Sequence, residues 1–489
     1  MSEKRQEKLY KPGTRDPELR TRLSGPRARL SGPRTPDPGP ELLDPGPGFE
    51  IPDRVLVVGM GKTGISLVKF LSKLGRKVTA TDTKPREELA SSLADLNGTP
   101  YEGHFGAHLR DDFLNHPMIV VSPGVSSDLP LLAEARSRGS KVIGEIELAA
   151  RFIEEPIIAV TGTNGKTTTT TLLGEVFSAA FGDVFVGGNI GNPLIEYVAS
   201  ARRARFVIAE ISSFQLETIE TFRPSTAILL NITEDHLDRY TSFDEYAAAK
   251  WRIFENQTPG DAALITLALA GKNGIRARKL YFSTGQKLEE GAFLDGNTLY
   301  VRLNGHEYRY ERDLSPLVGI HNSENLLSVL LTSHLHGIAQ PVVEKVMKSF
   351  RGLLHRMEFV REKDGRRFYN DSKATNVDAT KRALESMAGN VILIAGGKDK
   401  GGSYQVITQF SDRIKGLVLF GEAKEKIASE LSRHMATHQV ATLSEAVEKA
   451  FSLAGKGETI LFSPMCSSFD MFRDYKDRGD RFRAVVEAL

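Results

Sequence analysis

Short apolar runs alternate with segments of helical periodicity along most of the chain. Helical patterns such as residues 65–71 follow several of these runs. Continuous apolar runs of this length are typical of strands that are buried on both faces of a parallel sheet. The alternation therefore predicts an α/β fold with mainly parallel sheets. The clearest runs are residues 54–58 (RVLVV), 157–160 (IIAV), 206–209 (FVIA) and 391–395 (VILIA).

The length of 489 residues suggests three domains, because one domain typically takes about 150 residues. Residues 49–146 repeat the strand–helix pattern of a Rossmann-like unit, and residues 353–489 form a second such unit. Between them, residues 147–352 contain a phosphate-loop pattern and predict a P-loop ATPase-type domain.

Residues 1–48 are rich in proline, glycine and arginine and predict a disordered tail, because they hold few large apolar side chains. The sequence RLSGPR occurs at residues 22–27 and again at 29–34. Gly-Pro breaks in both copies exclude a coiled coil. Three interpretations stay open: a solvated tail, a start site placed too far upstream, or a basic segment for an acidic partner.

The phosphate-loop pattern lies at residues 161–168 (TGTNGKTT), directly after the apolar run at 157–160. A tight turn between a strand and a helix points backbone N–H groups at one anion. Lysine then supplies a charge for the terminal phosphates, and the following hydroxyl can bind Mg²⁺. Val160 stands where the general P-loop pattern has its first glycine, so this loop is a compact variant. The predicted ATP-binding residues are Gly162, Thr163, Asn164, Gly165, Lys166, Thr167 and Thr168.

Residues 59–64 (GMGKTG) fit the G-x-G-x-x-G pattern between the first apolar run and a helix, and the next strand ends at Asp82. This pattern predicts a dinucleotide-type fold in which Gly59 and Gly64 allow a close turn. The same unit holds any nucleotide diphosphate, so an NAD-dependent oxidoreductase is one hypothesis that the pattern alone leaves open.

Polar residues follow several other strands, at the edge where open α/β sheets bind ligands. Glu210 ends one strand, and His236 follows the strand at 227–231. Both are candidates for a metal site beside the triphosphate. Asn322 and Asn325 are three residues apart and share one face of a predicted helix.

The overall charge is close to balanced, with 64 basic and 62 acidic residues. We therefore expect no nucleic-acid or membrane partner. A single cysteine, Cys466, fits a reducing compartment. The absence of a long apolar segment or an apolar signal core favours a cytoplasmic protein, which we expect to be a monomer.

Three motifs together resemble the Mur ligase family: residues 161–168, 370–376 (NDSKATN) and 463–479 (SPMCSSFDMFRDYKDRG). The resemblance covers residues 51–489. The last two motifs look like those of the members that add D-glutamate to UDP-N-acetylmuramoyl-L-alanine. The resemblance implies an ATP-dependent ligase of peptidoglycan synthesis that forms an acyl phosphate, requires Mg²⁺ at two sites and carries a carbamate on Lys250.

The resemblance also implies roles for individual residues. Lys166, Glu210, His236, Lys250 and Lys373 match catalytic positions, and Thr167, Glu210, His236 and Lys250 match metal ligands. Asn322, Asn325, Arg356 and Asp371 match ATP contacts. Gly59, Lys62, Thr63, Gly64, Asp82, Thr83 and Asn189 fall on the UDP-substrate site, and Lys373, Thr375, Lys400, Ser468, Phe469 and Tyr475 fall on the D-glutamate site.

Two departures from the family pattern affect the D-glutamate site. Lys398 lies in the same GGKDKGG segment as Lys400 and could take its role. Phe469 and Tyr475 stand where well-known members have leucine and phenylalanine. A ligase with another amino acid or acceptor, or a nucleotide-binding regulator without catalysis, are the alternative hypotheses.

Overall fold

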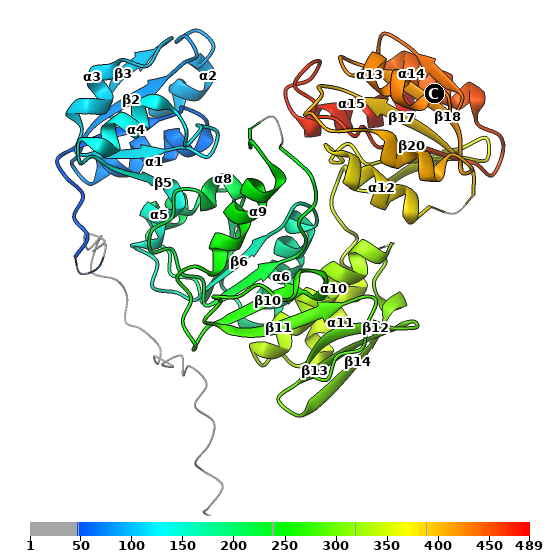
Figure 1. Cartoon of the computed structure of the whole chain (residues 1–489), viewed down its shortest axis with the longest axis horizontal. Helices are drawn as coiled ribbons and strands as arrows, with labels where there is room; N and C mark the ends of the chain where they lie inside the picture. Colours follow the sequence, from blue (N-terminus) through cyan, green and yellow to red (C-terminus); the bar gives the residue numbers. More distant parts are fainter. Residues whose placement is uncertain (1–45, 47, 237–238, 318, 388) are drawn as a thin grey trace, which may run out of the picture. The chain divides into compact units, whose positions relative to one another are not determined.

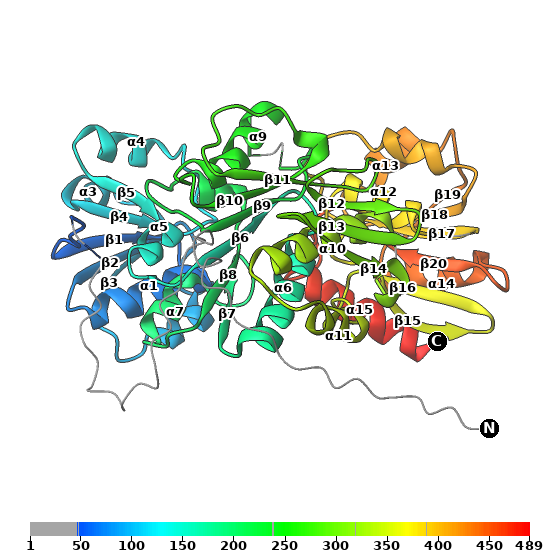
Figure 2. The same cartoon turned by 90° about the horizontal axis from the view of Figure 1, so that it is seen from below.

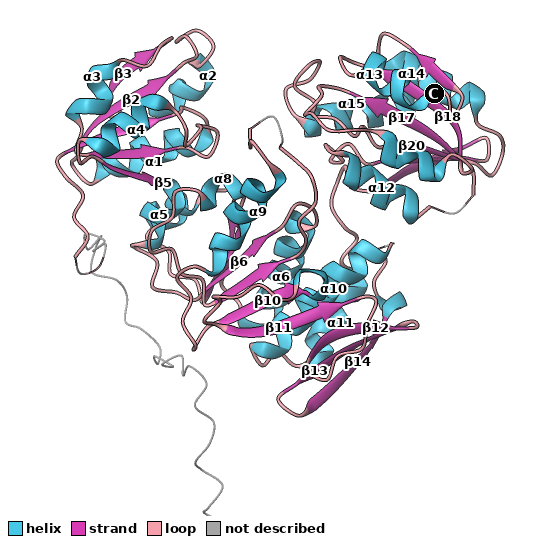
Figure 3. Ribbon diagram, viewed as in Figure 1, coloured by secondary structure: helices cyan, strands magenta, loops and turns pink. Residues whose placement is uncertain are grey.

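The computed structural model describes residues 46–489 except 47, 237, 238, 318 and 388. The described chain forms three separate sheets, each with helices packed on it (Figures 1 and 3). The predicted tail, residues 1–48, lies almost entirely outside the described residues.

The first sheet has the strand order β3-β2-β1-β4-β5, and all its strand pairs are parallel. Its strands are β1 (Arg54–Val58), β2 (Lys77–Asp82), β3 (Glu102–Phe105), β4 (Met118–Val121) and β5 (Lys141–Gly144). Its helices are α1 (Lys62–Lys73), α2 (Ala90–Leu93), α3 (Arg110–Asn115), α4 (Pro130–Ser137) and α5 (Glu145–Ala150).

The middle sheet has the order β14-β13-β12-β11-β10-β9-β6-β8-β7 and is parallel except for the two antiparallel pairs that β13 makes with β12 and β14. Its strands are β6 (Ile157–Thr161), β7 (Val184–Gly188), β8 (Phe206–Glu210), β9 (Thr226–Leu229), β10 (Ala262–Thr266), β11 (Arg278–Ser283), β12 (Gly291–Asp295), β13 (Thr298–Leu303) and β14 (His306–Glu311). Its helices are α6 (Lys166–Phe181), α7 (Leu194–Ala199), α8 (Ser213–Leu216), α9 (Phe243–Trp251), α10 (Ile320–Leu335) and α11 (Gln340–Ser349).

Helices α6 and α10 pack against each other on one face of the middle sheet (Figure 2). Side chains of β6 alternate between the two faces: Ile158 and Val160 join the core with α6 and α10, whereas Ile157 and Ala159 join the core on the opposite face. The continuous apolar run of β6 reflects this burial on both faces.

The third sheet has the order β15-β16-β20-β17-β18-β19, with only β15 antiparallel to its neighbour. Its strands are β15 (Glu358–Lys363), β16 (Arg366–Asn370), β17 (Val391–Gly396), β18 (Ile414–Phe420), β19 (Thr437–Gln439) and β20 (Thr459–Phe462). Its helices are α12 (Val377–Glu385), α13 (Lys424–Leu431), α14 (Leu443–Leu453) and α15 (Tyr475–Ala488). Five 3₁₀ helices complete the described elements: η1 (Ala94–Leu96), η2 (Arg252–Phe254), η3 (Leu267–Leu269), η4 (Arg312–Leu314) and η5 (Gln405–Phe410).

The predicted α/β class and the mainly parallel sheets are confirmed. The domain boundaries predicted at 146/147 and 352/353 fall between the sheets and stay a prediction. The strand expected at 227–231 ends two residues earlier, at Leu229. Among the described residues, no helix combines the length and apolar character needed to cross a bilayer.

Candidate active site

The phosphate loop leaves β6 and enters α6 within five residues, as the sequence predicts. Gly165 has a φ of +89°, in the left-handed region that favours glycine. A Cβ atom at Gly165 would lie 2.3 Å from Oδ1 of Asn325. The loop therefore requires glycine here both for its conformation and for the close approach of α10.

Lys166 is the first residue of α6, and its side chain folds back over the loop. Its Nζ donates to the backbone oxygens of Gly162, at 2.8 Å, and Thr163, at 2.9 Å. Burial lowers the pKa of Lys166, against the attraction of Glu210 and Asp235. The ammonium thus lies at the N-terminus of α6, where an anion is favoured.

Residues that follow β9 hold the phosphate loop in place. Asn164 donates its backbone N–H to Oδ1 of Asn231 at 2.8 Å, and Asn231 Nδ2 donates to the backbone oxygen of Asn164 at 3.1 Å. The Thr163 hydroxyl lies 3.1 Å from the Tyr246 hydroxyl. The loop is therefore fixed by its neighbours without a bound nucleotide.

Glu210 ends β8 and is 1% exposed. Its Oε1 accepts from Nδ2 of Asn189 at 2.8 Å, and its Oε2 is buried without a hydrogen-bond partner among the described residues. Thr167 lines the same cavity. A carboxylate oxygen with no such partner, in a cavity that a hydroxyl also lines, fits a hard cation such as Mg²⁺.

His236 has a φ of +56°, an unusual backbone conformation for a residue with a side chain. Its ring lies 4.8 Å from the ring of Phe214, between centroids. Burial lowers the pKa of His236 to about 4, although Asp235 acts in the opposite direction. The imidazole is therefore uncharged at neutral pH and has a nitrogen lone pair available for a metal.

Lys250 lies in α9 and is only 1% exposed, unlike an ordinary helix lysine. Its Nζ donates to the backbone oxygen of Gly162 at 3.0 Å and lies 4.5 Å from the centroid of the Tyr246 ring. No carboxylate of the described residues lies within ion-pair distance of this nitrogen. Burial, with Lys166 nearby, lowers the pKa of Lys250 well below its usual value.

The loop after β16 brings third-sheet residues to the same cavity. Burial raises the pKa of Asp371 to about 7, and its Oδ2 accepts from the Ser463 hydroxyl at 2.8 Å. Burial lowers the pKa of Lys373 to about 8, and its Nζ lies 3.9 Å from the centroid of the Tyr475 ring. Arg356 also lines the cavity, and its buried Nε has no hydrogen-bond partner within the described ranges.

Asp235 connects the loop after β9 to two residues of the third sheet's loops. Its Oδ2 accepts from Nδ2 of Asn376 at 2.9 Å, and its Oδ1 lies 3.2 Å from Nζ of Lys400. Burial acts to raise the pKa of Asp235, but Lys400 and His236 hold it below its usual value. Lys398 is exposed and does not line this cavity.

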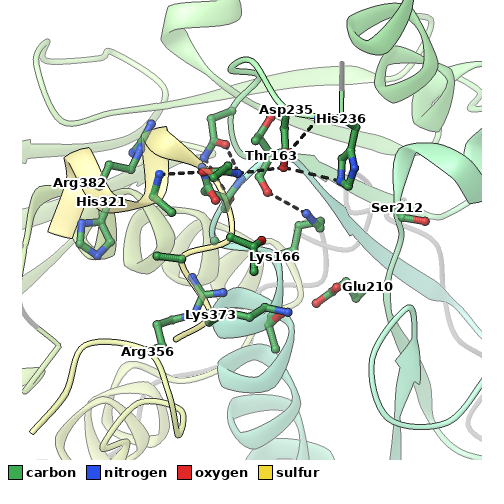
Figure 4. Close-up of a pocket in the computed structure, with 18 of the residues that line it drawn as sticks. Thr163, Lys166, Glu210, Ser212, Asp235, His236, His321, Arg356, Lys373 and Arg382 are labelled. Atoms are coloured by element: carbon green, nitrogen blue, oxygen red, sulfur yellow. Dashed lines mark hydrogen bonds and ion pairs between the residues drawn. The ribbon is translucent and has the colours of Figure 1, made fainter. Parts of the chain in front are cut away.

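These side chains surround one cavity of about 280 Å³ (Figure 4). Of the predicted catalytic, metal, ATP and D-glutamate residues, those that line it are Thr163, Asn164, Gly165, Lys166, Thr167, Glu210, His236, Lys250, Asn325, Arg356, Asp371, Lys373, Thr375 and Lys400.

Several predicted residues lie outside the lining of this cavity. Ser468 is buried, whereas Phe469 is 69% exposed. Asn322 is buried, and its Oδ1 accepts from Nδ2 of Asn325 at 3.2 Å. Gly162, Thr168 and Tyr475 are absent from the lining as well.

A second cavity, of about 700 Å³, borders the glycine loop of the first sheet. Six of the seven predicted UDP-substrate residues line it: Gly59, Lys62, Thr63, Asp82, Thr83 and Asn189. Asn189 lines both cavities.

The glycine loop is held by Asp82. Its Oδ2 accepts from the backbone N–H of Met60 at 2.6 Å, and its Oδ1 accepts from that of Lys84 at 2.9 Å. Gly64 does not line the cavity, but a Cβ atom there would lie 1.9 Å from the backbone oxygen of Gly59. Gly64 therefore permits the close packing of α1 on the loop.

Three family models match this chain in succession: the Mur ligase MurD-like N-terminal domain at residues 53–144, the Mur ligase middle domain at 160–333, and the Mur ligase glutamate ligase domain at 355–466. The chain belongs to the Mur ligase family. Each of the three domain models coincides with one of the three sheets.

Curated relatives within the Mur ligase family span nearly the whole chain. A protein of Geotalea daltonii named "UDP-N-acetylmuramoylalanine--D-glutamate ligase" is 48% identical over 89% of this chain and 97% of its own length. A protein of Desulfosudis oleivorans with the same name is 42% identical over 89% of this chain and 96% of its own.

Solved Mur ligase structures share the fold at low sequence identity. A pseudomurein peptide ligase type C from Methanothermus fervidus has a TM-score of 0.57 at 17% identity, covering 89% of this chain and 100% of its own. UDP-N-acetylmuramate-alanine ligase from Thermotoga maritima has a TM-score of 0.55 at 19% identity, with coverage of 89% and 99%.

Sequence reasoning missed several residues that line the two cavities of this Mur ligase, with four acidic, guanidinium or imidazole side chains among them. Asp235, His321 and Arg382 line the first, and His108 lines the second. Burial lowers the pKa of His321 to about 4, and in the part of the chain that the structure describes its buried Nδ1 has no hydrogen-bond partner. Of these four, only Asp235 could have been placed at the site from the sequence, since it adjoins His236 after a strand. The other three reach the cavities through contacts between distant segments.

Proposed function

We propose that this Mur ligase joins D-glutamate to UDP-N-acetylmuramoyl-L-alanine in peptidoglycan precursor synthesis, with ATP converted to ADP and phosphate. The observation that carries the proposal is the 48% identity to a relative with this printed name over 97% of that relative's length. The cavity that unites the phosphate loop with Lys373, Thr375 and Lys400 supports it independently.

In the first step, an oxygen of the alanyl carboxylate attacks the γ-phosphorus of ATP, and the bond from that phosphorus to the bridging oxygen of ADP breaks. Lys166 and the backbone N–H groups of residues 162–167 stabilise the charge on the transferred phosphoryl group. Lys166 exchanges its bonds to Gly162 and Thr163 for bonds to phosphate oxygens. Catalysis is thus electrostatic and positional.

In the second step, the amine nitrogen of D-glutamate attacks the acyl carbon, phosphate leaves, and the amine loses a proton. No side chain becomes a covalent nucleophile. Cys466, the only cysteine, is fully buried, and burial raises its pKa to about 12. The thiol is therefore inert.

Thr167 and Glu210 would hold a first Mg²⁺, with the unpaired Oε2 of Glu210 as the principal ligand. His236 and a carbamate on Lys250 would hold a second. Bound Mg²⁺ would neutralise the phosphate charge that develops during transfer.

We infer the carbamate on Lys250 first from the surroundings of its side chain. A buried lysine with no carboxylate partner among the described residues is unfavourable as a cation. Attack of the neutral amine on CO₂ forms a nitrogen–carbon bond and releases one proton. The product is an anion that supplies oxygen ligands in place of an ammonium.

D-Glutamate binds, in this proposal, to Lys373, Thr375 and Lys400, which line the first cavity. Ser468, which is buried, and Tyr475, which packs on Lys373, are further contacts by motif position only. Phe469 is exposed and outside the lining, so it is not retained as a contact. Cations suit the two carboxylates of this amino acid. Asn322, Asn325, Arg356 and Asp371 bind the nucleoside and phosphates of ATP.

The UDP-linked substrate occupies the second cavity, beside Gly59, Lys62, Thr63, Asp82 and Thr83. Gly64 acts indirectly, by allowing α1 to pack closely on the glycine loop. Asn189 lines both cavities, so it contacts the substrate where the alanyl end approaches ATP. A cytoplasmic location, where ATP is available, is part of the proposal.

The mechanism is tested with UDP-N-acetylmuramoyl-L-alanine labelled with ¹⁸O in the alanyl carboxylate. Acyl-phosphate formation transfers one label to inorganic phosphate when D-glutamate and ATP are present. Amide product with unlabelled phosphate would contradict this route. Absence of both product and phosphate with the complete substrate set would favour a regulator without catalysis.

A further inference from the structure

Helix α12 begins directly after the loop that carries Lys373 and Thr375, and its first turn meets the phosphate loop. Oδ2 of Asp378 accepts from Nδ2 of Asn164 at 2.8 Å and from Nε of Arg382 at 3.0 Å. Asp378 thus joins the nucleotide-binding loop of the middle sheet to a helix of the third sheet.

Asn164 is suited to transmit this contact because its backbone is already fixed. Its N–H and carbonyl oxygen are both bonded to the Asn231 side chain, at 2.8 and 3.1 Å. The Asn164 side chain therefore contacts α12 while its own backbone is held in place by hydrogen bonds. A displacement of Asp378 would act directly on the loop that holds the phosphates.

Arg382 extends the connection to α10. Its Nη1 lies 2.9 Å from Oε2 of Glu324, a residue between the predicted ATP contacts Asn322 and Asn325. The side chains of Arg382, Asp378 and Glu324 are 18%, 17% and 23% exposed, so solvent screens the network only partly. Arg382 also lines the cavity (Figure 4).

We propose that Asp378 is a positioning residue that couples the phosphate loop to the loop that carries Lys373 and Thr375. Its contacts with Asn164 and Arg382 hold α12 in a fixed position relative to bound ATP. Lys373 and Thr375, in the loop before α12, are thereby positioned as well. Nucleotide binding then favours the arrangement of α12 that receives the amino acid, because the nucleotide contacts this arrangement better than the alternatives. This inference rests on the proposed function for the identity of the two ligands.

The test compares Asp378→Ala, Asp378→Asn and the wild-type protein in steady-state phosphate release, using whichever amino acid supports turnover by the wild type. Asp378→Ala is expected to raise KM for ATP and for the amino acid about tenfold each, the effect of losing one hydrogen bond to a charged group. KM for the UDP-linked substrate stays unchanged. Asp378→Asn retains an acceptor for Asn164 and recovers part of the effect.

Glu385→Ala is the matched control, because Glu385 lies on the same helix and pairs only weakly with Lys381, at 3.8 Å. It should leave all three KM values unchanged. Equal KM values in Asp378→Ala and the wild type, or a parallel rise in KM for the UDP-linked substrate, would overturn the proposal.

A measurement without turnover separates this inference from the proposed function. The rise in melting temperature caused by a non-hydrolysable ATP analogue with Mg²⁺ should be smaller in Asp378→Ala than in the wild type and in Glu385→Ala. Should the wild type release no phosphate with any amino acid, the proposed function fails while this binding difference still decides the role of Asp378. Equal shifts in all three proteins would overturn that role.

Discussion

Nζ of Lys400 lies 3.2 Å from Oδ1 of Asp235, so a lysine from the loop after β17 pairs with a carboxylate from the loop after β9. Both side chains line the cavity that contains the phosphate loop. A carboxylate substrate that reaches this position meets a cation already oriented by Asp235. Of the two lysines in the GGKDKGG segment, Lys400 therefore faces this cavity, whereas Lys398 is exposed.

Replacement of Lys400 by alanine should raise KM for D-glutamate at least tenfold. The variant loses a cation for a substrate carboxylate, and a charge-assisted hydrogen bond contributes about 1.5–3 kcal/mol. Lys398→Ala is the matched control and should leave KM unchanged, because Lys398 is exposed. Initial rates at varied D-glutamate measure both, and a larger effect of Lys398→Ala would reverse the assignment.

Lys250→Ala should lower kcat by about 100-fold or more, the usual cost of removing one preorganised electrostatic group from an active site. Short carboxylic acids such as acetate should restore part of the rate, since they supply the oxygen ligands of the missing carbamate. Lys250→Arg keeps a cation but forms no carbamate, so acetate should not restore it. Equal rates in wild type and Lys250→Arg would contradict the carbamate.

Asp371 should make folding stability fall as pH rises. Its pKa is raised to about 7 by burial in the folded protein, against about 3.9 in an unfolded chain. Between these values the folded state holds a proton that the unfolded state lacks, so the free energy of unfolding decreases by up to about 1.4 kcal/mol per pH unit. Below pH 4 the carboxyl is protonated in both states.

Urea unfolding of ligand-free wild type and Asp371→Asn, from pH 4 to pH 8, measures this effect. The variant lacks the titrating carboxyl. Its free energy of unfolding, relative to that of the wild type, should therefore increase through this range and level off above pH 7. Parallel curves for the two proteins would contradict the raised pKa.

Local patterns predicted much of the fold and the site. β6 and β8 are apolar runs buried in the sheet, and parallel strands deliver their C-terminal residues to one edge. Thr161–Lys166 and Glu210 were therefore predictable from spacing alone. The tight phosphate loop needed only glycine and the helix pattern that follows it.

Contacts between distant segments were not predictable in the same way. Asp378 is 214 residues from Asn164, and no periodic pattern links them. The motif position of Phe469 predicted a contact in the D-glutamate site. The residue is instead 69% exposed and lies outside the cavity lining. Asp82 was expected at the UDP-substrate site and lines the second cavity, but the sequence did not indicate that both its oxygens accept from backbone N–H groups. Short polar strands such as β3 and β19 gave too weak a pattern to be predicted.

Phosphate release from ATP and Mg²⁺ with UDP-N-acetylmuramoyl-L-alanine, measured with D-glutamate, L-glutamate, D-aspartate or no amino acid, tests the proposed ligase activity most directly. Lys166→Ala is the inactive control. We expect release with D-glutamate only, accompanied by a new amide product, and none in Lys166→Ala. Release with another amino acid and none with D-glutamate would contradict the proposed substrate, and no release under any condition would contradict the ligase itself.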